Sequence, residues 1–293
     1  MIHPFLNYIF WDPHREMFDF NIPFLGRPIL WYGFFFALGF LFGYWIVVHL
    51  LRRFSIDYPE IKPRISYIVE KLAIYVIVGS VVGARLGDVL FYQEWSEYIR
   101  DPLSIFKIWQ GGLASHGGAI GVLGALFLLS RRLRKDLPQF SWKILLDFVV
   151  IPTALAGSLI RIGNFFNQEI LGKATALPWA IIFGHPTGSE AVVPRHPVQL
   201  YESLFYLASF ILLFCLWKYK AGMRRAGKIS GLFFMLIFSF RFFVEFFKVE
   251  QSPLMGGHSY LDMGQYLSIP LIVVGMIFFF KDQMPAMSGI KRD

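Results

Sequence analysis

Three arginines lie within long apolar stretches of this sequence, where a charged side chain is costly. Arg85, Arg161 and Arg241 would each cost at least about 2.5 to 3.5 kcal/mol at bilayer depth, so such residues usually face the protein interior and mark a binding site. Asp88 follows Arg85 by three residues, and Glu245 follows Arg241 by four. These two arginines could therefore have a structural role instead, as partners in helical ion pairs. Arg161 has no acidic residue at this spacing, and we expect it to bind an external anion such as phosphate.

A second candidate for chemistry is His116, which lies in the sequence GGLASHGGAIG. Histidine exchanges protons near neutral pH, and the flanking glycines leave room for a ligand, so His116 is a candidate general base. Alternatively, Gly117, Gly121 and Gly124 have the spacing of small residues that pack membrane helices together, and the histidine hydrogen-bonds a neighbouring helix. The glycines lack the Lys-Ser or Lys-Thr of a nucleotide-binding loop, and no zinc-binding spacing occurs among the seven histidines. We therefore expect no metal and no cofactor.

Membrane helices must position these residues, because the composition excludes an ordinary soluble domain. Hydrophobic residues make up 56% of the chain and charged residues only 16%, against about a quarter in soluble proteins. Residues 28–51 and 108–130 carry no formal charge, and each segment exceeds the roughly 20 residues that cross a bilayer. Five further apolar segments bring the predicted number of spans to seven: 72–92, 144–166, 196–217, 229–247 and 263–280. The sequence therefore predicts an all-α polytopic membrane protein without a cleavable signal peptide.

Lysine and arginine are distributed unevenly between the predicted loops. Segments 52–71, 131–143, 218–228 and 281–293 contain 5, 5, 5 and 3 of them, whereas the remaining loops and ends together contain seven. Because translocated loops avoid these residues, we expect a periplasmic N-terminus and a cytoplasmic C-terminus, and we attribute the net charge of +8 to topology and not to a nucleic-acid partner. The prediction is a single membrane domain over residues 1–293, with a periplasmic N-terminal arm at 1–28 and a small periplasmic cap at 167–195.

This topology predicts that the polar residues of the spans share one depth. The three arginines come late in outward spans, whereas Tyr32, His116 and Glu202 open inward spans, so all lie in the outer half of the membrane. A lipid headgroup is the obvious phosphate there. A transporter of anionic lipids is an alternative, but it needs polar residues in the inner half, where the spans carry only His49 and Asp147. A third interpretation, a seven-span sensor, needs a signalling domain, which the 13-residue C-terminal tail cannot form.

Cys215 is the single cysteine and lies in the apolar run ILLFCLW, where we expect it to pack as a small hydrophobic residue. One cysteine cannot form an intrachain disulfide or a thiolate metal cluster. Any thiol chemistry must therefore use a cysteine of another protein.

Six motifs of this sequence are similar to those of one family of membrane enzymes. The segment RIGNFFNQEILG at 161–172 resembles the signature of the bacterial prolipoprotein diacylglyceryl transferases, which has Gly-Arg-x-Gly-Asn-Phe, a hydrophobic residue, Asn-x-Glu and a glycine three residues on. Supporting motifs occur in family order along nearly the whole chain: WYG at 31–33, GARLGDVLFY at 83–92, GGLASHGG at 111–118, PRHPVQLYE at 194–202 and FRFFVEFF at 240–247. The sequence departs from the family pattern at Ile160, where the signature has glycine, and at Ile237, where some relatives have a tyrosine.

The resemblance implies a defined reaction and its substrates. The enzyme would transfer the diacylglyceryl group of phosphatidylglycerol to the lipobox cysteine thiol of a preprolipoprotein, forming a thioether and releasing glycerol 1-phosphate, as the first step of bacterial lipoprotein maturation. It would act in the cell inner membrane, with its active site towards the periplasmic leaflet. The thiol must become a thiolate to attack, and His116 is the candidate base. Arg161 and Arg241 would bind the phosphate and stabilise it as the leaving group.

The resemblance also suggests roles for the other polar residues. Tyr32, Asn164 and Glu169 are assigned to the glycerol of the headgroup. Glu202 and Glu245 are expected to orient the arginines. The predicted substrate-binding set further contains Arg85, Gly117 and Gly118.

Overall fold

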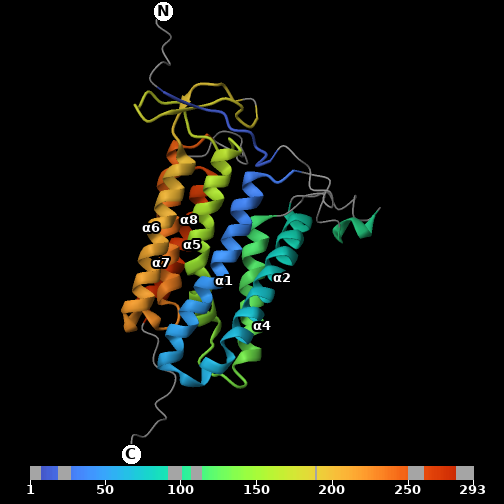
Figure 1. Cartoon of the computed structure of the whole chain (residues 1–293), viewed down its shortest axis with the longest axis vertical. Coiled ribbons are helices and arrows are strands. Elements are labelled where there is room, and N and C mark those ends of the chain that lie inside the picture. Colours follow the sequence, from blue (N-terminus) through green and yellow to red (C-terminus); the bar gives the residue numbers. More distant parts are fainter. Residues whose placement is uncertain are drawn as a thin grey trace, which may run out of the picture. The chain divides into compact units, whose positions relative to one another are not determined.

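A computed structural model describes residues 8–18, 28–91, 101–106, 114–188, 190–249 and 261–281 of the chain (Figure 1). Most of these residues are helical, and one small three-stranded sheet accompanies the helices. The chain divides into two compact units, a larger unit formed by Met1–Trp45 with Val150–Asp293 and a smaller unit formed by Ile46–Val149. The helices α1 (Trp31–Asp57) and α5 (Trp142–Phe166) each contribute residues to both units.

Six helical segments of the described chain are long and apolar enough to cross a membrane. They are Trp31–Asp57, Pro59–Phe91, Trp142–Phe166, Val198–Tyr219, Lys228–Phe247 and Met263–Phe280. The remaining predicted span corresponds to α4 (Ser115–Leu133), which ends near Arg131 and Arg132, while residues 108–113 at its predicted start lie outside the described residues. The prediction of a helical polytopic membrane protein is confirmed.

In the smaller unit, α2 (Ile65–Phe91) packs along α4 through glycines (Figure 1). A Cβ atom at Gly83 would overlap the carbonyl oxygen of Gly117, and one at Gly121 would overlap that of Gly79. Such close backbone approach is typical of small-residue contacts in membranes. The helix-packing interpretation is therefore confirmed for Gly117 and Gly121, but it is wrong for Gly124, which faces open space. The short helices η1 (Pro59–Arg64) and η2 (Pro102–Phe106) flank α2 in the sequence.

The larger unit contains three further long helices, of which the first contacts α5 through the Ser158 and Ser203 hydroxyls and the others pack on one another in chain order (Figure 1). These are α6 (Val198–Tyr219), α7 (Lys228–Val244) and α8 (Met263–Phe280), with the short helices η4 (Ala221–Arg224) and η5 (Glu245–Phe247). Gly231 and Gly275 allow the backbones of α7 and α8 to approach closely. Asp262 and Gln265 form a capping box that starts α8. Cys215 is exposed on α6, so the expectation that it packs inside the protein is wrong.

A small sheet stands at one end of the helices of the larger unit (Figure 1). Strand β1 (Ile9–Trp11) pairs in parallel with β2 (Ile181–Phe183), which pairs antiparallel with β3 (Pro194–Arg195). The sheet therefore joins the described part of the predicted N-terminal arm to the segment predicted as a cap. Trp11 packs on Phe165 at the end of α5, with ring centroids 4.6 Å apart.

Polar contacts strengthen the junction between the arm and the sheet. Oδ1 of Asp12 lies 2.5 Å from Nδ1 of His185 and accepts a hydrogen bond of 3.1 Å from Nε2 of Gln168. These two hydrogen bonds, that of His185 first, lower the pKa of the Asp12 carboxyl below its ordinary value of 3.8. The arm is thus tied to the turn that follows α5, which leads directly into the site.

Candidate active site

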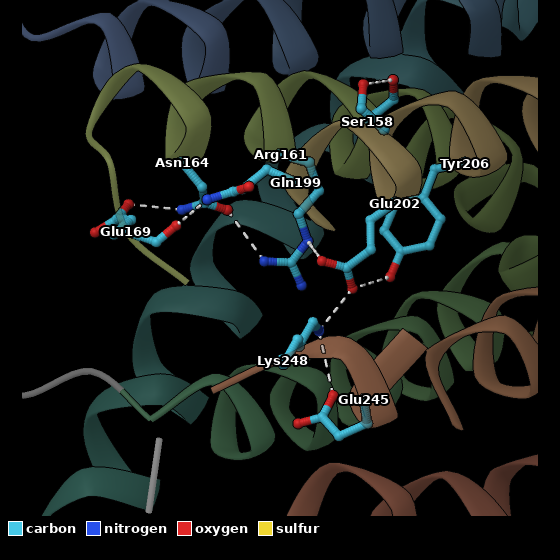
Figure 2. Close-up of polar contacts among 10 residues, drawn as sticks. Ser158, Arg161, Asn164, Glu169, Gln199, Glu202, Tyr206, Glu245 and Lys248 are labelled. Atoms are coloured by element: carbon cyan, nitrogen blue, oxygen red, sulfur yellow. Dashed lines mark hydrogen bonds and ion pairs between the residues drawn. The ribbon is translucent and has the colours of Figure 1, made fainter. Parts of the chain in front are cut away.

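Arg161 lies in the last turns of α5, on the side that meets α6. Its Nε lies 3.0 Å from Oε2 of Glu202, and its Nη1 donates a hydrogen bond of 3.0 Å to Oδ1 of Asn164 (Figure 2). The third nitrogen, Nη2, points away from both partners (Figure 2). The protein therefore fixes the guanidinium along one edge, while only 13% of the side chain is exposed. A fixed and largely buried guanidinium can bind an oxyanion through charge-assisted hydrogen bonds.

A buried lysine links two carboxylates beside Arg161. Nζ of Lys248 donates hydrogen bonds to Oε1 of Glu202 at 3.0 Å and to Oε2 of Glu245 at 3.2 Å (Figure 2). Glu202 is 0% exposed and Lys248 only 4%, so solvent ions screen this network little. The Glu245 carboxylate fits because residue 264 is glycine, since a Cβ atom there would stand 2.6 Å from Cδ of Glu245. The network fixes Glu202, and through it the guanidinium of Arg161.

Tyr206 brings the second arginine of interest into the same cluster. The ring packs directly on α5, where a Cβ atom at Gly157 would lie 3.2 Å from the ring atom Cδ2. The hydroxyl donates a hydrogen bond of 3.3 Å to Oε1 of Glu202 (Figure 2). The phenol also interacts electrostatically with both Arg161 and Arg241. The two arginines, one from α5 and one from α7, therefore both act electrostatically on one phenol.

The second arginine, Arg241, lies in the last turn of α7 and is partly buried. The spacing in the sequence offers an ion pair with Glu245. However, α7 ends at Val244, and Glu245 begins η5, where its carboxylate pairs with Lys248. Within the described residues no ion pair joins Arg241 to Glu245, so the helical-pair alternative is wrong for this arginine. Among the described residues, Glu245 is therefore not the partner of this charge.

The turn after α5 presents amide and carboxylate groups next to the arginine of that helix. Asn164 Nδ2 donates a hydrogen bond of 2.6 Å to Oε1 of Glu169, and Gln199 Nε2 donates one of 2.8 Å to the backbone carbonyl of Glu169. Gln168 and Ile170 have positive φ angles of 54° and 57°, which residues with a Cβ atom rarely adopt. The surrounding contacts therefore hold a strained turn in one conformation.

Tyr32 approaches the same turn from the start of α1. Its backbone passes close to α5, where a Cβ atom at Gly163 would stand 3.0 Å from Cα of Tyr32. The phenol interacts electrostatically with Glu169 and Arg161. The larger unit thus gathers most of the predicted site residues in one cluster: Tyr32, Arg161, Asn164, Glu169, Glu202, Arg241 and Glu245.

Arg85 belongs to the smaller unit, where its partners come from the protein itself. Its Nη1 lies 3.4 Å from Oδ2 of Asp88, so the predicted helical ion pair is confirmed. Its Nε and Nη2 donate hydrogen bonds of 2.8 and 2.7 Å to the backbone carbonyls of Ile105 and Ser104. These contacts tie η2 to α2, which supports the structural alternative for Arg85.

His116 also belongs to the smaller unit. It is the second residue of α4, and its side chain is exposed. The next two residues face α2, because Gly117 approaches the backbone of Gly87 and Gly118 is buried against Ala84. In the described residues these two glycines contact the protein backbone, and their predicted role in substrate binding stays a prediction.

Sequence reasoning missed three residues that the structure places in the cluster: Tyr206, Lys248 and Gln199. The sequence carried a weak signal for two of them. Tyr206 follows Glu202 by four residues and Lys248 follows Glu245 by three, so each shares a helix face with an acid. The sequence carried no such signal for Gln199, whose complete burial in the first turn of α6 only the structure shows.

Comparison with known proteins gives one consistent result. Residues 20–281 match the family model described as prolipoprotein diacylglyceryl transferase. A phosphatidylglycerol–prolipoprotein diacylglyceryl transferase of Chloroherpeton thalassium is 41% identical, with 94% of each chain covered. Proteins of the same name from Tolumonas auensis and Protochlamydia amoebophila are 41% and 35% identical, covering 84% and 95% of this chain and 88% and 96% of their own. This chain therefore belongs to the prolipoprotein diacylglyceryl transferase family.

Proposed function

We propose that this chain transfers the diacylglyceryl group of phosphatidylglycerol to the lipobox cysteine of a prolipoprotein, with Arg161 and Arg241 binding the lipid phosphate. Relatives that match almost the whole chain are named for this reaction, which supports the activity. The phosphate site is supported by the pair of arginines around Tyr206, one of which is fixed by Glu202 and Asn164.

The arginines suit the change of charge that this reaction requires. The phosphodiester of the lipid carries one negative charge, and the departing glycerol phosphate gains a second as the carbon–oxygen bond breaks. Fixed guanidinium groups then bind the leaving group more strongly than the substrate, and this difference accelerates the reaction. Arg161 needs little reorganisation, because Glu202 and Asn164 already hold two of its nitrogens.

The headgroup glycerol is proposed to lie at the turn after α5. Asn164 accepts a hydrogen bond from Arg161 and donates one to Glu169, so it connects the phosphate-binding group to a carboxylate. A carboxylate accepts hydrogen bonds from hydroxyl groups such as those of glycerol. Tyr32, which interacts with both Glu169 and Arg161, adds a phenol at the same place.

The acidic residues have different supporting roles. Glu202 orients Arg161 directly, as its contact of 3.0 Å suggests. Glu245 acts through Lys248, which it shares with Glu202. Lys248 and Arg161 together balance the negative charge of the two carboxylates.

The thiol of the prolipoprotein must lose its proton before it attacks, and His116 is the proposed base. Its exposed position at the start of α4 is compatible with access by another protein. Arg85, Gly117 and Gly118 are proposed to support substrate binding from the same unit. We further propose that the site faces the periplasmic leaflet of the inner membrane, with the arm at 1–28 and the cap at 167–195 on that side.

Purified protein, phosphatidylglycerol and a lipobox peptide would test this proposal. Wild type should add one diacylglyceryl group to the peptide and release an equal amount of glycerol phosphate, both measured by mass spectrometry. Folded Arg161→Gln should lose about 100-fold or more of the activity, because one charged donor to a developing anion is removed. Arg64→Gln is the matched control, since Arg64 forms an ion pair but its side chain is 49% exposed. Lipid movement without any thioether product would contradict the transferase and favour the transporter.

A further inference from the structure

The hydroxyl of Tyr206 contacts Glu202, the carboxylate that holds Arg161, and the proposed function gives this hydroxyl no role. The residue is only 6% exposed, and its ring is fixed against the α5 backbone at Gly157. Arg161 lies within hydrogen-bonding reach of the phenol, and Arg241 acts on it electrostatically. A phosphate held by both arginines would therefore lie next to this hydroxyl.

The present hydrogen bond of the Tyr206 hydroxyl can be exchanged at low cost. It reaches Oε1 of Glu202 at 3.3 Å, which is long for a hydrogen bond from a hydroxyl group. Lys248 holds the same oxygen at 3.0 Å, and its charge makes that hydrogen bond the stronger one. If the phenol turns towards a ligand, Oε1 of Glu202 keeps the hydrogen bond from Lys248 and is not left without a donor.

We propose that Tyr206 donates a hydrogen bond to the phosphate oxygen that leaves with glycerol phosphate. This inference rests on the proposed transferase function and adds a catalytic residue to it. In the transfer step, the thiolate sulfur forms a bond to C3 of the diacylglyceryl group while the bond from C3 to oxygen breaks. The electron pair of that bond stays on the oxygen, so the charge of the thiolate becomes the second charge of the phosphate. No proton has to move, and the phenol keeps its hydrogen.

The phenol and the arginines contribute at different stages of the reaction. The arginines are charged throughout, so they also stabilise the bound substrate. The hydrogen bond from the neutral hydroxyl of Tyr206 becomes strongest when the leaving oxygen becomes an anion. It therefore lowers the activation barrier without strengthening the binding of the substrate. A purely structural role, in which Tyr206 only packs on Gly157 and contacts Glu202, predicts no dependence on the leaving atom.

Tyr206→Phe keeps the ring and removes the hydroxyl. With saturating phosphatidylglycerol, its single-turnover rate should fall about 10- to 100-fold, the effect of losing one hydrogen bond to a charged group, while the lipid concentration at half-maximal rate stays within about 3-fold. Tyr201→Phe is the matched control on the same helix, because the Tyr201 hydroxyl accepts a hydrogen bond of 2.8 Å from Trp179, away from the arginines. It should retain the wild-type rate.

A second lipid separates catalysis from structure. In a phosphatidylglycerol analogue with sulfur in place of the oxygen between C3 and phosphorus, the leaving atom accepts hydrogen bonds weakly. The defect of Tyr206→Phe should then shrink to less than about 3-fold, because the lost hydrogen bond matters less. An equal defect with both lipids would overturn the proposal and leave Tyr206 a packing residue. Absence of thioether product in wild type would instead contradict the proposed function itself, so the two failures are distinguishable.

A further substitution tests the proposal without removing any contact. Replacing Tyr206 with 3-fluorotyrosine keeps the ring and makes its hydroxyl a stronger donor. The rate with the natural lipid should rise or hold at a pH where the phenol stays protonated. A rate that falls to the level of Tyr206→Phe under those conditions would also overturn the proposal.

Discussion

Replacing Lys248 with methionine should destabilise the protein by about 3 kcal/mol, because it leaves two carboxylates without their shared cation. The Lys248 side chain is 5% exposed, and its partners Glu202 and Glu245 are 0% and 16% exposed. Breaking a buried ion pair by removing one partner costs about 3 to 5 kcal/mol. Arg161 continues to pair with Glu202 at 3.0 Å, which places the expected cost at the lower end of this range.

Equilibrium unfolding in mixed micelles, followed by tryptophan fluorescence, would measure this change. Arg64→Met is the matched control, because its ion pair with Asp136 is 3.4 Å long but 49% and 71% exposed, and such pairs contribute about 1 kcal/mol or less. The double variant Lys248→Met with Glu245→Gln should recover part of the loss, since it removes one uncompensated charge. A loss for Lys248→Met no larger than that of Arg64→Met would refute the reasoning about the buried network.

Three further predictions concern helix packing, pH and the site. Gly83→Ala should destabilise the protein by about 1 to 3 kcal/mol in thermal unfolding, because its Cβ would collide with the backbone of α4, whereas Gly124→Ala, which faces open space, should be neutral. Burial lowers the pKa of His196 below 6.5, so the unfolded state binds a proton more readily than the folded state. The free energy of unfolding should therefore fall as the pH drops below about 6.5, and His196→Gln should reduce this pH dependence. Gly264→Ala should slow transfer about 10-fold or more in the peptide assay, because its Cβ would displace the carboxylate of Glu245.

Apolar length and spacing predicted the helices well, because both are local properties of the sequence. The pair of Arg85 with Asp88 was predictable for the same reason, since both residues lie within α2. The carbonyl groups of Ser104 and Ile105 that also bind Arg85 were not predictable, because they come from a different element. Contacts within one helix follow from spacing, whereas contacts between elements need the fold.

The structural alternative for Arg241, a helical ion pair with Glu245, was wrong because another residue takes the carboxylate. The backbone spacing is still helical at this point, because Glu245 has φ −59° and ψ −30° and its N–H donates to the carbonyl of Arg241. Lys248, three residues further on, nevertheless binds the carboxylate at 3.2 Å. Spacing shows which pairs a helix allows, but it cannot decide between two competing partners.

The acidic partner of Arg161 illustrates a different limit. The sequence correctly showed that α5 itself has no acid at helical spacing from this arginine. The partner, Glu202, comes from α6, and packing of α6 on α5 also places the ring of Tyr206 against Gly157. Ile237 leaves α7 without a tyrosine one turn before Arg241, and the phenol that interacts electrostatically with that arginine comes from α6. Spacing within one helix could not show this arrangement.

The central claim is that Arg161 and Arg241 stabilise the phosphate as it leaves. The most direct test uses the variants Arg161→Gln and Arg241→Gln. For each variant, the single-turnover transfer rate at saturating phosphatidylglycerol is measured together with the binding constant of the same lipid. We predict that each substitution lowers the transfer rate about 100-fold and weakens lipid binding much less, because the interaction strengthens in the transition state. Variants that bind the lipid poorly but transfer the bound group at the wild-type rate would contradict the account.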